Sequence, residues 1–176
     1  AWAPDTRLAV NVSPIQLASP SLVDSVMDVL QRVGLPADRL ELEITESVLA
    51  RDPAAARAML QRLRAAGVRI AIDDFGVGYS SMAQLRELPF DSLKLDQSFA
   101  AALLQDGARD MTRSIIASVV QLARSMQLTV VAEGVEVQEQ LEMLRGLGCT
   151  LLQGYLFGKP GPIAALMAEV AESERA

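Results

Sequence analysis

Hydrophobic and polar positions follow two periodicities, which alternate along the chain. Short apolar or alternating runs predict strands at residues 8–12, 40–46, 69–73, 92–96, 128–133 and 150–154. Between them, apolar residues recur every three or four positions and predict helices at residues 22–33, 53–66, 80–87, 110–126 and 137–147, with a last helix from Pro162 to Val170. In the longest helix, the apolar stripe that we expect to face the sheet consists of Met111, Ile115, Val119, Leu122 and Met126. Repeated strand–helix units predict a parallel sheet covered by helices.

One face of the predicted strands is polar. Glu41, Glu43 and Thr45 alternate with apolar residues in the second strand. Parallel strands that are covered on both faces are continuous apolar runs, so an open doubly wound sheet fits this pattern poorly. A barrel can hold polar side chains in its interior, near the C-terminal ends of the strands where active sites form. We therefore predict an α/β fold, a TIM-like (β/α)8 barrel of which this chain contains about six C-terminal βα units.

Composition limits the possible functions. Of the 176 residues, 51% are hydrophobic and 22% are charged, which is typical of a globular domain. The net charge of −6 argues against a DNA-binding protein, which would carry a basic face. The absence of histidine removes the usual zinc ligand and general base, and the single cysteine, Cys149, fits a reducing compartment such as the cytoplasm. No apolar run is long enough to form a membrane segment, and no signal peptide is visible.

The start of the chain bears on its domain organisation. The first residue, Ala1, is not a methionine, and the first predicted strand follows within a few residues. We therefore interpret the start as a cut in a longer sequence. The expectation is one domain over residues 1–176, the C-terminal portion of an N-terminally truncated barrel, with no second domain in this chain. An opened barrel would expose two strand edges, which can pair with another copy of the chain.

Each predicted strand carries a polar side chain at or near its C-terminal end. A single such acid is usually a helix cap or an ion-pair partner, but the same feature in consecutive strands indicates a common site. The residues are Asn11, Glu43, Glu46, Asp73, Asp74, Lys94, Asp96, Glu133 and Gln153. Oxygen ligands without histidine or cysteine suit Mg²⁺ or Mn²⁺. The carboxylates suffice for two such ions, which together can activate water and clamp both oxygens of an in-line phosphoryl displacement.

A glycine-rich loop follows the third predicted strand. The adjacent carboxylates Asp73 and Asp74 precede it, and both stay ionised only when a cation is close by. Glycine lets the backbone turn sharply or approach a ligand closely. The residues that we assign to this loop are Phe75, Gly76, Gly78 and Ser80.

The chain resembles the EAL family, bacterial phosphodiesterases that hydrolyse cyclic di-GMP to the linear dinucleotide pGpG. The matching segments run in the family's order: residues 10–13 (VNVS), 41–46 (ELEITE), 73–81 (DDFGVGYSS), 91–96 (DSLKLD), 132–136 (AEGVE) and 153–157 (QGYLF). The resemblance implies a TIM-like barrel, in agreement with the alternation of the strands. It also implies two Mg²⁺ or Mn²⁺ ions per site, with Ca²⁺ inhibitory because its looser coordination holds the water less tightly.

The resemblance assigns metal-binding roles to five residues. It implies that Asn11, Glu43 and Asp73 bind one ion. Asp73 would bridge to a second ion, which Asp74 and Glu133 help to place. The glutamate of the family's Glu-Ala-Leu signature and an arginine expected to touch substrate phosphate are missing from this sequence. We attribute both losses to truncation, which should weaken the first metal site and lower the activity of this chain by itself.

The resemblance also implies catalytic and substrate-binding roles. Lys94 would hold or help to deprotonate the attacking water beside Glu133, and Gln153 would orient water or phosphate. Glu136 would anchor the loop at residues 75–81, which in relatives lies near a dimer contact. The residues expected to contact the substrate are Asp96, Gln153, Tyr155 and Phe157.

Structural interpretations stay open beside these roles. Lys94 would also serve as a counter-ion to Asp96 or Glu43. Asp96 and Glu41 fit a supporting hydrogen-bond network better than direct binding of a metal. Glu46 would serve to cap the segment that follows the second strand.

Three functions are compatible with these residues, in descending order of support. The first is hydrolysis of cyclic di-GMP in bacterial second-messenger signalling. The second is a non-hydrolysing cyclic di-GMP receptor or a regulatory domain that acts through protein contacts. The third is another Mg²⁺-dependent barrel, such as an enolase-type lyase. The resemblance further implies a cytoplasmic homodimer that works behind a sensory or GGDEF-type domain.

Overall fold

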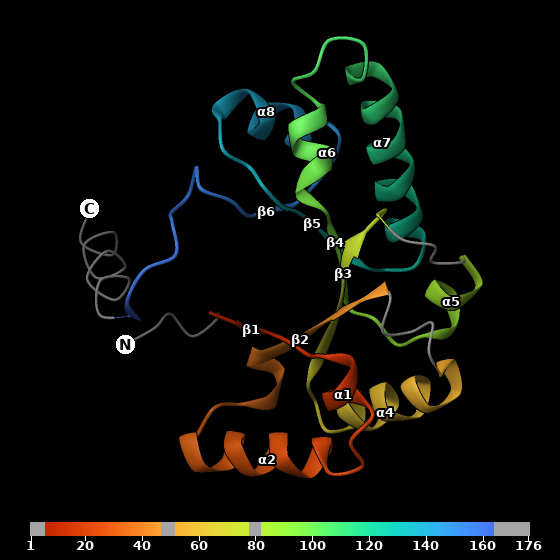
Figure 1. Cartoon of the computed structure of the whole chain (residues 1–176), viewed down its shortest axis with the longest axis vertical. Coiled ribbons are helices and arrows are strands. Elements are labelled where there is room, and N and C mark those ends of the chain that lie inside the picture. The colour runs from red at the N-terminus through yellow and green to blue at the C-terminus, as the bar shows by residue number, and fades with distance from the viewer. Residues whose placement is uncertain (1–5, 47–51, 78–81, 164–176) are drawn as a thin grey trace.

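The computed structural model describes residues 6–46, 52–77 and 82–163. One parallel sheet runs through it in sequence order: β1 (Leu8–Asn11), β2 (Leu40–Thr45), β3 (Arg69–Phe75), β4 (Ser92–Leu95), β5 (Thr129–Ala132) and β6 (Leu151–Leu152). The sheet curls into an arc with the helices on its outer side and with β1 and β6 at its two ends (Figure 1). This arrangement is that of a partial (β/α)8 barrel, which confirms the predicted fold.

The predicted helices are present with small shifts of their ends. They are α1 (Pro14–Leu17), α2 (Leu22–Val33), η1 (Ala37–Arg39), α4 (Pro53–Ala65), α5 (Met82–Glu87), α6 (Gln97–Ala102), α7 (Arg109–Ser125) and α8 (Gln138–Gly146). The helices α1, α6 and η1 were not predicted. The sequence signals for two of them were caps, since Ser13 and Gln16 form a capping box on α1 and Asp96 caps α6. The helix predicted from Pro162 to Val170 lies almost entirely outside the described residues.

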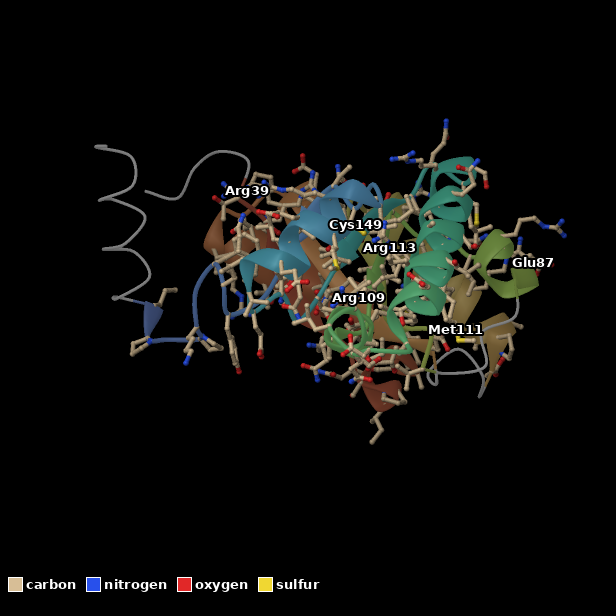
Figure 2. All side chains as sticks on the ribbon, turned by 90° about the horizontal axis from the view of Figure 1, so that it is seen from above. Arg39, Glu87, Arg109, Met111, Arg113 and Cys149 are labelled. Atoms are coloured by element: carbon tan, nitrogen blue, oxygen red, sulfur yellow. The ribbon has the colours of Figure 1, made fainter. Side chains whose placement is uncertain are left out.

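The buried face of α7 differs from the predicted one. Its buried residues are Thr112, Ile116, Val120 and Ala123. Met111, labelled in Figure 2, is 71% exposed, and Ile115 is 42% exposed, so the prediction was wrong for both. Each buried residue follows a residue of the predicted stripe by one position, and Val119 and Met126 of that stripe still pack against the core, partly buried.

The two faces of the sheet have different roles. On the outer face, Ile44, Ile72 and Leu93 pair in register and are completely buried beneath the helices. Burial of each such side chain stabilises the fold by about 1.5–3 kcal/mol. The inner face carries the polar residues, of which Glu43 and Lys94 are also buried. Because side chains alternate along a strand, the packing of the outer face fixes which polar residues point inward.

Candidate active site

Lys94 lies at the centre of the polar inner face. Its side chain is only 5% exposed, and its Nζ lies 2.6 Å from Oε1 of Glu43 and 2.6 Å from Oε1 of Glu133. Asp73 Oδ1 lies 3.3 Å from the same ammonium group. The four residues come from β2, β3, β4 and the position just after β5. The curl of the sheet therefore brings together the strand-end residues that the sequence predicted.

Partial or full burial changes the proton affinity of these groups. Burial disfavours the Lys94 ammonium, but its hydrogen bonds to Glu133 and Glu43 outweigh burial and raise its pKa above the ordinary value. Burial also raises the pKa of Glu133, against the lowering effect of Lys94. The pKa of Asp74 is raised by desolvation and by the negative charge of Asp73. The single positive charge of Lys94 thus does not balance the negative charges of the surrounding carboxylates. The site therefore favours an additional cation.

The carboxylates at the end of β3 fit a divalent metal ion. Asp73, Asp74 and Glu133 each offer an oxygen, and these three atoms lie within 4.8 Å of one another. Asp73 Oδ1 is buried and accepts no hydrogen bond within the described structure, and the Lys94 ammonium lies 3.3 Å from it. A bound cation would supply a closer partner for this oxygen. The donor set of carboxylate oxygens suits Mg²⁺ or Mn²⁺.

A backbone irregularity lets two adjacent residues serve this one site. Neighbouring side chains in a regular strand point to opposite faces, so Asp73 and Asp74 should diverge. The register between β3 and β4 shifts between Ile72 and Phe75, and Asp74 adopts a left-handed conformation with φ 54°. Aspartate tolerates this conformation better than most residues, and a bulge re-aims the side chain. The Asp74 carboxylate consequently joins the Asp73 side of the sheet.

A cavity of about 290 Å³ adjoins the carboxylates. It is lined by Asp74, Asp96, Gln97, Glu133, Gly134, Glu136, Gln153, Gly154 and Tyr155. Most of the residues predicted to contact substrate therefore line the cavity, together with Gln97, Gly134 and Gly154, to which sequence reasoning gave no role. Phe157 is not part of this lining and is 54% exposed.

Several predicted site residues have structural partners. Asp96 accepts a hydrogen bond from the backbone N–H of Ser98 at 2.9 Å, and it is not in the ion-pair network of Lys94. Of the two predicted counter-ions of Lys94, the described structure therefore confirms Glu43 alone. Asn11 pairs in register with Glu43 on the neighbouring strand, which places it at the same edge of the sheet. Its metal-binding role stays a prediction.

The described part of the glycine-rich loop contacts Glu46 and Phe99. The backbone N–H of Gly76 donates to Oε1 of Glu46 at 3.4 Å. Among the described residues, no hydrogen bond joins Glu136 to the loop, and the anchoring role of Glu136 stays a prediction because residues 78–81 lie outside the described part. Gly76 has φ 100°, and a Cβ at this position would lie 2.6 Å from the ring of Phe99 on α6. Two further predicted loop residues, Gly78 and Ser80, lie outside the described residues.

Comparison with known proteins identifies the family. The sequence model of the EAL domain matches residues 1–160. The chain belongs to the EAL domain family. This confirms the resemblance noted in the sequence and agrees with the half-barrel architecture. Within the described residues, no helix of this EAL domain has the length and hydrophobicity needed to cross a membrane.

Two proteins of Pseudomonas aeruginosa are similar to this EAL domain over most of its length. MucR, described as a bifunctional diguanylate cyclase and cyclic di-GMP phosphodiesterase, is 46% identical over 167 residues, which are 95% of this chain and 24% of MucR. NbdA, described as a cyclic di-GMP phosphodiesterase, is 48% identical over 160 residues, which are 91% of this chain and 20% of NbdA. The chain therefore spans a quarter or less of the length of these curated relatives.

Solved structures of related EAL proteins have the same fold. The MucR phosphodiesterase in complex with c-di-GMP superposes with a TM-score of 0.85 at 45% identity, over 91% of this chain and 64% of that one. BlrP1 of Klebsiella pneumoniae, solved with manganese and cyclic di-GMP, gives a TM-score of 0.81 at 36% identity, over 89% of this chain and 39% of that one. A calcium complex of BlrP1 is equally similar. Structures of relatives thus contain divalent cations, the class of ion that the carboxylates here fit.

Proposed function

We propose that this EAL domain hydrolyses cyclic di-GMP to linear pGpG. The observation that carries the proposal is the convergence of Asp73, Asp74 and Glu133 within 4.8 Å, with one buried Asp73 oxygen left without a hydrogen bond. A cluster of this kind supports phosphoryl-transfer chemistry that depends on divalent ions. The names of MucR and NbdA and the c-di-GMP complex of MucR support cyclic di-GMP as the substrate.

The proposed cofactors are two Mg²⁺ or Mn²⁺ ions, with Ca²⁺ inhibitory. When bound, such ions lower the pKa of a water molecule and stabilise charge on the phosphoryl oxygens. The proposed ligands are Asn11, Glu43, Asp73, Asp74 and Glu133. Asn11 is supported by its register with Glu43 on the neighbouring strand. The other four residues are supported by their short distances to Lys94 or to one another.

The remaining site residues would position water and substrate. Lys94 reaches both Glu43 and Glu133, so its ammonium is well placed to hold the attacking water between the proposed metal ligands. Gln153 and Tyr155 line the adjoining cavity and would contact phosphate and a guanine base. The residues with further proposed substrate or positioning roles are Asp96, Glu136 and Phe157.

The proposal extends to the setting in which the domain works. MucR combines a diguanylate cyclase with a phosphodiesterase, and this supports a GGDEF-type or sensory domain as a partner of the present domain. A cytoplasmic homodimer is the proposed state. Light scattering coupled to size-exclusion chromatography, over a range of concentrations, tests the dimer, and a constant monomer mass would refute it.

A product assay tests the proposed hydrolysis. The chain and the complete product of its gene receive cyclic di-GMP with Mg²⁺, Mn²⁺ or Ca²⁺, and pGpG is separated by chromatography. Turnover with Mg²⁺ or Mn²⁺ that disappears in Asp73→Asn, but persists in the exposed variant Asp38→Asn, is the expected result. Binding of cyclic di-GMP without turnover by the complete product would refute hydrolysis and indicate a receptor.

A further inference from the structure

A second cavity lies at the opposite end of the half-barrel from the carboxylates. It has a volume of about 960 Å³, and its lining comes from the ends of α4, α5 and α7 and from the starts of β3, β4 and β5. Volumes of about 300–1,000 Å³ are typical of sites for small molecules. None of the residues assigned to hydrolysis above lines this cavity.

The charges around this cavity are strongly positive. Arg64, Arg69 and Arg86 line it, and Asp91 is the one acid in the lining. Asp91 is already engaged, because its Oδ2 accepts a hydrogen bond from the backbone N–H of Ile70 at 3.0 Å and its Oδ1 lies 3.4 Å from Arg64. Within residues 6–46, 52–77 and 82–163, neither Arg69 nor Arg86 makes an ion pair or a side-chain hydrogen bond. Two guanidinium groups thus have no ion-pair partner among the described residues of a chain whose net charge is −6.

One of these guanidinium groups has a buried donor without an acceptor. Nε of Arg69 is buried and makes no hydrogen bond, and only one other side-chain atom of the described residues is in this state, Oδ1 of Asp73. A buried donor without a partner is destabilising, and native proteins leave few of them. Oδ1 of Asp73, although 3.3 Å from the Lys94 ammonium, makes no hydrogen bond and lies beside the carboxylates of Asp74 and Glu133, where a cation fits. By the same reasoning, the unpaired Nε of Arg69 indicates that its guanidinium group, which lines the cavity, lacks an acceptor within the described residues.

The lining also indicates the kind of anion. Guanidinium groups match the geometry of phosphate oxygens and can bind them through two parallel hydrogen bonds. Ser125 and Thr129 add hydroxyl groups to the polar part of the wall. Leu88, Leu122 and Leu128 form a partly exposed apolar part that a hydrated inorganic ion would leave uncovered. A ligand with both an anionic group and an apolar body fits this wall best.

We infer that this cavity binds a small organic phosphate monoester, with the phosphate held by Arg69 and Arg86 and the organic part against the leucines. The site is separate from the one proposed for cyclic di-GMP, so it stands whether or not the domain hydrolyses that substrate. Because the cavity opens at the start of β3, β4 and β5, a ligand there would not compete with one bound at the carboxylates.

Binding of two probes tests the inference directly. Phenyl phosphate and inorganic phosphate are titrated separately into the ¹⁵N-labelled chain in EDTA, and the amide signals are followed by NMR. EDTA is included because divalent ions would otherwise attract phosphate to the carboxylates. We expect phenyl phosphate to shift the signals of Ile70, Leu128 and Thr129 and to bind more tightly than inorganic phosphate. Binding of neither probe at millimolar concentration, or equal affinity for the two, would overturn the inference.

Arginine variants show whether the probe occupies this cavity. Arg69→Gln and Arg86→Gln should each weaken binding of phenyl phosphate about tenfold or more, because each removes a charged hydrogen-bond donor. Arg113→Gln is the matched control, since Arg113 is an exposed arginine of α7 outside the cavity (Figure 2). Arg86 is itself exposed, so its replacement leaves the fold intact and keeps the test decisive if Arg69→Gln does not fold. Unchanged affinity in Arg86→Gln would overturn the inference.

Discussion

Replacing Lys94 by methionine tests whether its ammonium holds the carboxylates of the inner face together. The side chains of Glu43, Asp73 and Glu133 are 8%, 11% and 19% exposed, so all three would face one another without a cation. Methionine keeps most of the volume of lysine and removes the charge. The variant therefore isolates electrostatics from packing.

The expected loss of stability follows from the distances. Two unit charges 2.6 Å apart attract by about 6 kcal/mol at an effective dielectric constant of about 20. The desolvation of Lys94 offsets part of this attraction, and removing one partner of a buried ion pair typically costs about 3–5 kcal/mol. We expect Lys94→Met to lower the free energy of unfolding by that amount in EDTA. Single domains have about 5–15 kcal/mol in total, so the variant should be close to unfolding.

Urea unfolding followed by circular dichroism measures this loss. Lys159→Met is the control, because Lys159 is exposed and is the only other lysine of the chain. The control should change stability by no more than about 1 kcal/mol, because the Lys159 ammonium makes only an exposed cation–π contact, 5.6 Å from the centroid of the Tyr155 ring. Added Mg²⁺ should restore part of the loss in Lys94→Met, because a divalent ion supplies the missing positive charge. If Lys94→Met unfolds in EDTA at the same urea concentration as the unmodified chain, the ion-pair network does not stabilise the fold.

Three further predictions concern the metal ion, the loop and the cysteine. Asp73→Asn should abolish the rise in melting temperature that Mn²⁺ produces, and an unchanged rise would place the ion elsewhere. Gly76→Ala should cost about 1–3 kcal/mol of stability, because alanine is strained at φ 100° and its Cβ meets the ring of Phe99. In a chain that already carries Phe99→Ala, Gly76→Ala should cost less stability in urea unfolding, which would confirm the steric cause, and an equal loss would contradict it. Burial raises the pKa of Cys149 from 9.0 to about 11, so the folded chain keeps a proton that the unfolded chain loses above pH 9. The unfolding free energy of the unmodified chain, measured relative to that of Cys149→Ala, should therefore fall by about 1 kcal/mol between pH 8 and pH 10. A difference that stays constant with pH would refute the link between the thiol proton and stability.

The half-barrel and the acids of its inner face were predictable because both depend on local periodicity. The alternation of Glu41, Glu43 and Thr45 with apolar residues fixes two faces of β2, whatever packs against them. Helix ends were equally local, since Asp52 caps α4 through the backbone N–H of Ala55 and Gly34 ends α2 in the left-handed conformation. Parallel strands have their C-terminal ends at one edge, so residues at these ends had to meet.

The sequence by itself therefore determined the order of the elements, the two faces of the strands and the chemical class of the site. Only the tertiary structure decided which stripe of α7 is buried, because several stripes are apolar enough and contact with the sheet selects one. It also decided that Asp74 turns toward Asp73 at a bulge, and that Glu46 contacts the glycine-rich loop. Arg69 and Arg86 belong to elements that are separate in sequence, and their shared cavity exists only after the chain has folded. Such features depend on contacts between distant segments, which no local pattern encodes.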